Sequence, residues 1–143
     1  MPNKETFLKE MGPRIGRLVD KKGRLYFEVA GKDLHEVVKY LFHKMDCRLS
    51  TATAMETYHG LEVLYHFSHD STGQYYCPRV LMTDKKNPRM SSIAPIVKGA
   101  EWIEREMTEM LGITFDGHPR PERLLTREHP KGLDQPLRLR RPS

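Results

Sequence analysis

Apolar and polar residues alternate along several short segments with the two-residue period of a β-strand. Residues 14–19 and 24–30 both show this pattern, on either side of a polar turn at residues 20–23, and together they predict a hairpin. Three further segments have strand patterns and are separated by short turns: residues 47–57, 61–67 and 74–82. Strands joined in this way predict an antiparallel sheet.

Two segments outside these strands have apolar residues at helical spacing. The clearer pattern starts at Leu34 and continues to Met45. Asp33 and Glu36, at the start of this segment, have the spacing of a capping box. Residues 3–11 predict a short opening helix from a sparser pattern.

A third helix is predicted after the last strand, from residue 100 to residue 111. Gly112 follows it at the position where a helix end needs a left-handed residue. Glu104 and Glu106 fall at the two edges of the apolar arc. Arg105, Thr108 and Glu109 are expected to point away from an apolar arc made of Ala100, Ile103, Met107, Met110 and Leu111.

Hairpin strands with one helix inserted between them and another after them predict an α+β fold, with an antiparallel sheet and helices packed on one face. We assign residues 1–112 to this domain. Residues 113–143 contain five prolines and no sustained period, which predicts an extended tail rich in proline and arginine. Such a segment gains order by lying along a partner.

The chain has a net charge of +5 and a pI near 9.3, which favours an anionic partner. Basic residues gather near the start, from Arg14 to Arg24, and more densely in the tail, from Arg120 to Arg141. No stretch approaches the roughly 20 apolar residues of a membrane helix. The first residues lack the apolar centre of a signal peptide, so we expect the chain to stay in the cytoplasm.

Residues that could carry chemistry are few. Cys47 and Cys77 do not form a Cys-x-x-Cys pair, and we expect two reduced thiols in or beside strands. His66 and His69 would lie on opposite faces of one strand, which disfavours a metal site. No glycine-rich nucleotide-binding motif is present. His118 is the best acid–base candidate, although a structural hydrogen bond is the role that we favour for it.

The third helix and the loop after it resemble a signature of respiratory complex I, that of the C subunit of its NADH dehydrogenase and of the relatives of that subunit. In that signature Glu-Arg-Glu, an acidic residue, two apolar residues, Gly-Ile, an aromatic residue and Gly-His-Pro follow in this order. The matching residues are Glu104, Arg105, Glu106, Glu109, Met110, Leu111, Gly112, Ile113, Phe115, Gly117, His118 and Pro119. The resemblance continues upstream to Ser92 and downstream to Arg138, and it implies the same kind of α+β fold.

Two departures point to one branch of this family. Complex I members continue Gly-His-Pro with Asp-Leu-Arg-Arg, whereas this chain has the residues Arg120, Pro121, Glu122 and Arg123. Complex I members also tend to close with Leu-Arg-Lys-Asp-Tyr, which this chain lacks. In these respects it is more similar to the corresponding subunit of energy-converting, membrane-bound nickel–iron hydrogenases.

The resemblance implies a scaffold protein without a cofactor, on the cytoplasmic side of a membrane-bound, ion-translocating oxidoreductase. Its partners would be a large catalytic subunit, of the hydrogenase type or of the complex I D type, together with an iron–sulfur small subunit and membrane subunits. Iron–sulfur clusters and nickel–iron would reside on those partners. The implied interface residues are Trp102, Glu104, Arg105, Glu106, Phe115, Gly117, His118, Pro119, Arg123, Leu124, Leu125 and Arg138.

Three alternatives remain open at this stage. Within the family, the chain could be the C component of an NADH– or ferredoxin–quinone oxidoreductase. A nucleic-acid-binding protein would account for the basic tail, but no aromatic residue follows Phe115 to stack on bases. A small enzyme acting through His118 and Glu106 has less support.

Overall fold

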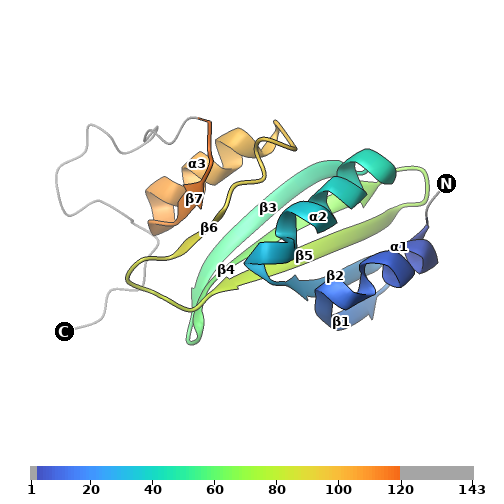
Figure 1. The fold of residues 1–143 in the computed structure, drawn as a ribbon, viewed down its shortest axis with the longest axis horizontal. Helices are drawn as coiled ribbons and strands as arrows, with labels where there is room; N and C mark the ends of the chain where they lie inside the picture. Colours follow the sequence, from blue (N-terminus) through green and yellow to red (C-terminus); the bar gives the residue numbers. More distant parts are fainter. Residues whose placement is uncertain (1–2, 120–143) are drawn as a thin grey trace. The chain divides into compact units, whose positions relative to one another are not determined.

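The computed structural model describes residues 3–119, and five of its strands form one sheet in the order β1-β2-β5-β4-β3 (Figure 1). Short 3₁₀ turns at Gly12–Arg14 and Gly31–Asp33 connect some of its elements. In chain order the elements are α1 (Lys4–Met11), β1 (Ile15–Lys21), β2 (Arg24–Val29), α2 (Leu34–Lys39), β3 (Arg48–Thr57), β4 (Gly60–His69), β5 (Gln74–Met82), β6 (Arg89–Ser91), α3 (Ala100–Leu111) and β7 (Thr114–Asp116). The α+β prediction is confirmed.

The sheet is not purely antiparallel, and in this respect the prediction was wrong. β1 and β2 form the expected antiparallel hairpin, but β2 pairs in parallel with β5. The reason is the order of strands. After β2 the chain passes through α2 and then forms β3, β4 and β5 in succession, and the last of these three strands lies beside β2.

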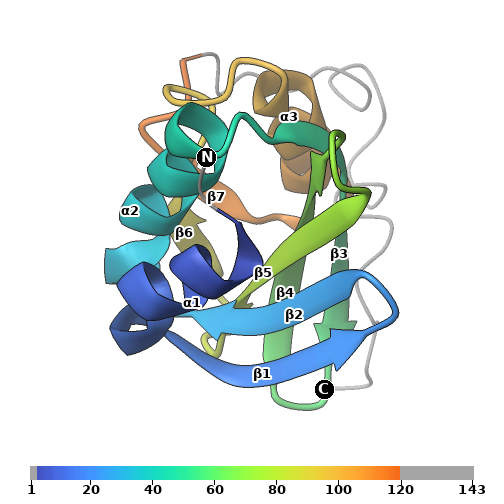
Figure 2. The same ribbon diagram turned by 90° about the vertical axis from the view of Figure 1, so that its right-hand side faces the viewer.

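Packing within the chain divides it into two units, the first being Met1–Thr53 with Val63–Leu81. In this unit α1 and α2 lie on the same side of β2 and β5 (Figure 2). The Phe7 side chain of α1 is fully buried, and its ring centroid lies 5.3 Å from that of Phe27, 5.8 Å from that of Tyr40 and 5.1 Å from that of Tyr76. The aromatic cluster therefore fixes the helices on one face, as predicted.

The two N-terminal helices begin differently. Asn3 caps α1, because its side-chain oxygen accepts a hydrogen bond from the Thr6 amide at 3.0 Å. The capping box predicted at Asp33 is absent: Asp33 makes no side-chain cap, and its carboxylate lies 3.8 Å from the Arg14 guanidinium. A 3₁₀ turn precedes α2 and puts Asp33 in helical geometry, where a cap residue would need an extended backbone.

The end of the predicted second helix widens into a π-helical turn, Tyr40–Lys44. The Met45 amide donates to the Tyr40 carbonyl at 3.0 Å, and Leu41 and Met45 are fully buried. The apolar spacing predicted this burial correctly, although it could not predict the wider turn.

Cys47 and Cys77 are buried free thiols, as predicted. Burial raises the pKa of Cys47 to about 12 and that of Cys77 to about 11. At neutral pH both side chains are protonated, which makes them poor nucleophiles in the folded protein.

The second unit combines Ala54–Glu62 with the chain from Met82 onward. Its small sheet pairs β6 in parallel with β7, and Arg89 Nε donates to both carboxylate oxygens of Asp116 at 2.7 and 2.9 Å. The folded part therefore extends beyond residue 112, where we expected the tail to begin. Ile113 and Phe115 alternate with exposed residues and are buried, which explains why this segment forms a strand. The rest of the predicted tail lies outside the described residues.

Candidate functional site

The outward side of α3 carries the largest exposed aromatic side chain of this helix. Trp102 is 57% exposed, and Glu106, one turn later, is exposed beside it. The opposite side buries Ala100, Met107 and Leu111. Gly112 ends the helix in the left-handed conformation, with φ of 76°, as the sequence predicts. The helix thus presents an exposed tryptophan from a defined position.

A buried carboxylate holds the inner side of α3. Glu104 is fully buried; its Oε1 accepts from the Ser92 hydroxyl at 2.6 Å and its Oε2 from the Ile93 amide at 3.0 Å. The Ser92 hydroxyl oxygen also accepts from the Ala94 amide at 3.0 Å. Because these donors belong to the segment that follows β6, Glu104 ties that segment to the helix. Its carboxylate serves this chain and lies away from any outer surface.

Arg105 and Glu109 are also buried, at 9% and 1% exposure, so the prediction that they point away from the core was wrong. The prediction counted only apolar residues as inward-facing. Arginine and glutamate have long aliphatic stems that can cover apolar surface. The buried part of α3 is therefore wider than its apolar arc.

The turn after β7 is anchored to the start of α3. His118 Nε2 donates to the Glu101 carbonyl at 2.8 Å, and the His118 amide donates to the Phe115 carbonyl at 3.3 Å. Gly117 permits this turn with φ of 82°. The imidazole thus makes a structural hydrogen bond of the kind we expected, and it places the turn next to the first turn of α3, where Trp102 lies.

The structure separates the predicted interface residues into three groups. The exposed or half-buried group can form a surface and comprises Trp102, Glu106, Gly117, His118 and Pro119. A second group is buried within the chain and comprises Glu104, Arg105 and Phe115. Phe115 was expected to anchor a partner, but as an inward residue of β7 it is only 5% exposed. The remaining four, Arg123, Leu124, Leu125 and Arg138, lie outside the described residues.

Sequence reasoning missed Ser92 as the partner of Glu104. The two residues are 12 positions apart, and no periodicity connects a residue after one strand with a residue inside a later helix. A buried glutamate does require donors, and that requirement was the available signal. We name the surface of Trp102, Glu106, His118 and Pro119 the α3 face.

Ligand-type side chains gather at few places in the part of the chain that the structure describes. No group of three His, Cys, Asp or Glu residues there could hold a metal ion. His66 Nδ1 lies 3.6 Å from Cys77 Sγ. Among residues 3–119, no helix combines the length and the apolar character that crossing a lipid bilayer requires.

His66 gives the fold a pH dependence. Burial, and then the charge of Arg24, hold its pKa below the ordinary 6.5. Below pH 6.5 the unfolded state takes up a proton that the folded state resists, so stability present above pH 6.5 is lost as the pH falls toward the folded pKa. Since the side chain is partly exposed, we expect this loss to be below about 1 kcal/mol. Urea unfolding at pH 7.5 and 5.5 should show it in the wild type and not in His66→Gln; equal pH dependence in both would contradict it.

Comparison with known proteins adds a family to this geometry. Residues 27–142 match the family model described as respiratory-chain NADH dehydrogenase, 30 kDa subunit. This range contains α3 and the α3 face. It also contains most of the five-stranded sheet.

Three relatives illustrate the likeness. The chloroplastic J subunit of NAD(P)H-quinone oxidoreductase from Pelargonium hortorum is 33% identical over 76% of this chain and 72% of its own length. The C/D subunit of NADH-quinone oxidoreductase from Bacteroides thetaiotaomicron is 38% identical over 52% of this chain and 14% of its own length. A chain of the membrane-bound sulfane sulfur reductase, an archaeal respiratory membrane complex, has the same fold, with a TM-score of 0.71, 22% identity, and coverage of 93% of this chain and 76% of that one.

The chain spans only part of many relatives. Its match covers between 14% and 59% of the length of five curated proteins, whose names designate them C, C/D or J. These proteins therefore contain further sequence that this chain does not match.

Proposed function

The chain belongs to the family of the 30 kDa subunit of respiratory-chain NADH dehydrogenase, and on this premise we propose that it is a non-catalytic subunit of a membrane-bound, ion-translocating, complex I-like oxidoreductase. Its role is to scaffold the large catalytic subunit. The observation that carries this proposal is the family match across residues 27–142. The fold alone would not support it, because one fold serves many functions.

The geometry of α3 supports a scaffolding role. Glu104 and the Gly112 cap fix the helix from inside, and His118 fixes the adjacent turn. Trp102 therefore projects from a rigid support. Exposed tryptophans are enriched among the residues that dominate binding energy in protein interfaces, and a rigid one loses little entropy on binding.

The partner that we propose for the α3 face is the large subunit, of the hydrogenase type or of the complex I D type. The C/D designation of one relative supports this choice, because that protein joins the two letters in one chain and this chain matches only 14% of it. An iron–sulfur small subunit and membrane subunits complete the assembly. Iron–sulfur clusters, and nickel–iron where present, reside on those partners, and this chain lies peripherally on the cytoplasmic side of the membrane.

Within the family we favour an energy-converting hydrogenase type of complex. The sequence Arg120, Pro121, Glu122 and Arg123 after Gly-His-Pro supports this choice, as does the absence of the usual complex I ending. The alternative is the C component of a quinone-reducing complex, which the names of the curated relatives favour. Sulfur-reducing complexes are represented by the archaeal neighbour.

Affinity purification of the full-length chain from solubilised membranes of its native cells tests the proposal. We expect a large oxidoreductase subunit among the co-purifying proteins identified by mass spectrometry. Paired Cys-x-x-Cys ligands and bound nickel in that subunit would indicate a hydrogenase. A large subunit without them would indicate quinone or sulfur chemistry and would overturn the finer assignment.

Replacing Trp102 by alanine should weaken binding of the large subunit by about 30-fold, as loss of an interface aromatic worth about 2 kcal/mol predicts. The melting temperature of the isolated chain should hardly change, because the side chain is 57% exposed. Titration of the purified large subunit onto the immobilised chain measures this affinity.

Tyr58→Ala is the matched control, since it removes another aromatic ring, 82% exposed, from a turn outside α3. It should bind as the wild type does. Equal affinity for Trp102→Ala and the wild type would remove α3 from the interface.

A further inference from the structure

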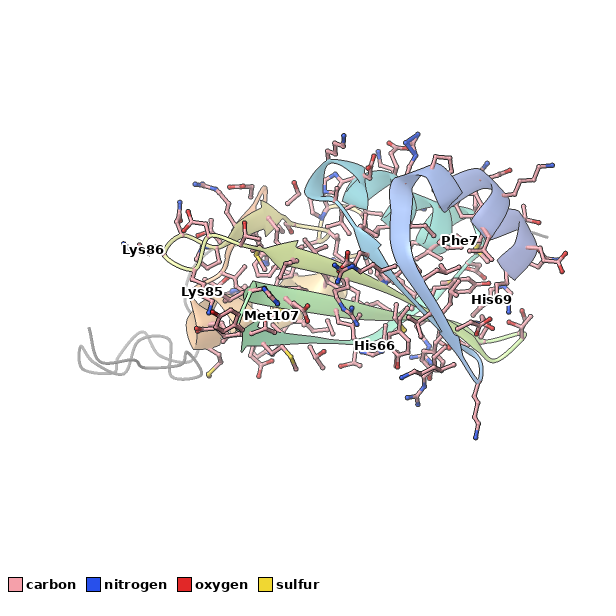
Figure 3. The ribbon with its side chains drawn as sticks, turned by 90° about the horizontal axis from the view of Figure 1, so that it is seen from below. Phe7, His66, His69, Lys85, Lys86 and Met107 are labelled. Carbon is pink, nitrogen blue, oxygen red and sulfur yellow. The ribbon has the colours of Figure 1, made fainter. Side chains whose placement is uncertain are left out.

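The first unit has a second sheet face, opposite to the one that α1 and α2 cover. Strand register assigns side chains to it, because residues directly opposite each other in a pair share a face. Val19 pairs with Tyr26, and Tyr26 with Cys77. The neighbouring Leu25 and Phe27 are buried beneath the helices. Figure 3 shows Phe7 on the helix-covered side and His66, which contacts Cys77, on the other side.

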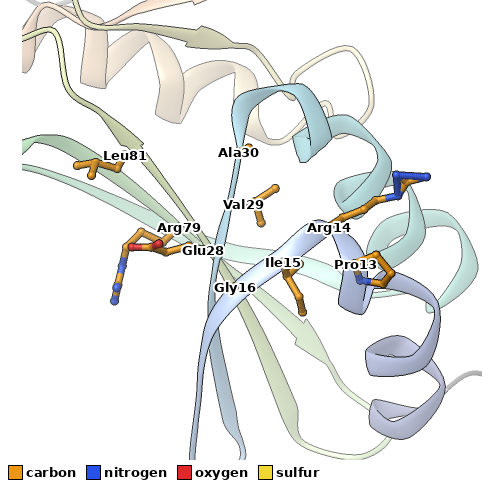
Figure 4. Close-up of a pocket in the computed structure, with 9 residues that line it drawn as sticks. All are labelled: Pro13, Arg14, Ile15, Gly16, Glu28, Val29, Ala30, Arg79 and Leu81. Atoms are coloured by element: carbon orange, nitrogen blue, oxygen red, sulfur yellow. The ribbon is translucent and has the colours of Figure 1, made fainter.

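This open face, defined by Val19, Lys21, Arg24, Tyr26, Arg79 and Leu81, presents apolar groups to solvent. Val19 is 44% exposed and Leu81 is 38% exposed, and the ring of Tyr26 is half-buried between them in sequence order across the strands. At one end, Arg79 and Leu81 line a surface hollow with Gly16 and Glu28 (Figure 4). A hollow with an apolar edge can receive an inserted side chain.

The same face is basic. It carries Lys21, Arg24 and Arg79, against the carboxylate of Glu28. Glu28 lies 3.5 Å from the Arg17 guanidinium, which offsets its charge. A surface with an apolar centre and a cationic rim complements an acidic protein segment with apolar side chains.

We infer that the open face is a second docking surface, and that it binds an acidic segment of a partner subunit. The residues after the described part of this chain are a poor occupant on charge grounds, because residues 120–143 contain seven Arg or Lys against three Asp or Glu. Like charges brought together across an interface oppose binding. The inference depends on the proposed function only in that the chain works inside an assembly.

Charge reversal tests the inference on the full-length, tagged chain in its native cells. The double variant Lys21→Glu/Arg79→Glu should recover at least tenfold less of one partner subunit than the wild type, with an unchanged melting temperature. The control Lys9→Glu/Lys39→Glu makes the same charge change at exposed sites on α1 and α2. It should recover every partner at the wild-type level.

The outcomes separate the two proposals. If the wild type recovers oxidoreductase subunits and the Lys21→Glu/Arg79→Glu variant recovers all of them equally well, the open face is not a docking surface, while the proposed function stands. If the wild type recovers none, the proposed function fails and this inference fails with it.

A photo-crosslinking residue, p-benzoylphenylalanine, at position 81 identifies the occupant directly. We expect a crosslink to an acidic segment of another protein of the assembly, and none from the same residue at position 9 on α1. A crosslink to residues 120–143 of the same chain, or to lipid, would overturn the inference.

Discussion

Replacing Glu104 by alanine is expected to lower the free energy of unfolding by about 3 kcal/mol, since the change leaves buried donors without their acceptor. The donors are the Ser92 hydroxyl and the Ile93 amide, which lie 2.6 and 3.0 Å from the carboxylate. A loss of this size is a large part of the stability of a small domain. Urea unfolding followed by circular dichroism measures it.

Two matched variants make this result interpretable. Glu104→Gln keeps one carbonyl oxygen for the Ile93 amide and should lose only about 1 kcal/mol. Glu106→Ala removes an exposed glutamate two positions away and should change stability by less than about 0.5 kcal/mol. If Glu104→Ala proves as stable as Glu106→Ala, the buried carboxylate does not hold α3.

A double-mutant cycle with Ser92→Ala assigns the energy to the contact itself. Residues in one hydrogen-bonded network show coupling of about 0.5–3 kcal/mol, and we expect a value in the upper half of that range. Additive losses would mean that the two side chains stabilise the chain independently.

Replacing Gly60 by alanine is expected to destabilise the second unit by about 3 kcal/mol. A Cβ atom at this position would lie 2.1 Å from the Met82 carbonyl oxygen and 3.0 Å from the Thr83 Cα, and both of these are backbone atoms. Gly60 also has φ of 153°, a conformation that side chains rarely adopt. The start of β4 and the end of β5 would have to separate to admit the methyl group.

Gly99→Ala is the control for this substitution, because nothing lies within 4 Å of a Cβ atom there and its φ of −61° suits any residue. It should unfold within about 0.5 kcal/mol of the wild type. Similar unfolding free energies for the two alanine variants would show that the approach of Gly60 to Met82 is not constrained.

The local elements could be predicted because each has its own periodic signal. Alternation in Leu25, Phe27 and Val29 predicted β2, and the spacing of Leu34, Leu41 and Met45 predicted the burial of α2 and the turn after it. The parallel pairing of β2 with β5 had no such signal. It depends on which of three later strands returns to β2, and that choice is made by packing between distant residues.

The site was predictable only in part. Trp102 stands out in sequence and is exposed, but Glu104, Arg105 and Phe115 were assigned to an interface and are buried. A resemblance identifies residues that recur together without saying whether they touch a partner or position those that do. For Glu104 the structure supports positioning, through Ser92, and this explains why a charged helix can present a tryptophan rigidly.

Native mass spectrometry of the tagged chain, purified from its own membranes without chemical crosslinking, tests the central claim most directly. The account predicts one particle that contains this chain, a large oxidoreductase subunit and iron–sulfur subunits, with all iron assigned to the partners after the particle is dissociated. A solitary monomer that turns over substrate, or iron or flavin that stays with this chain, would contradict it.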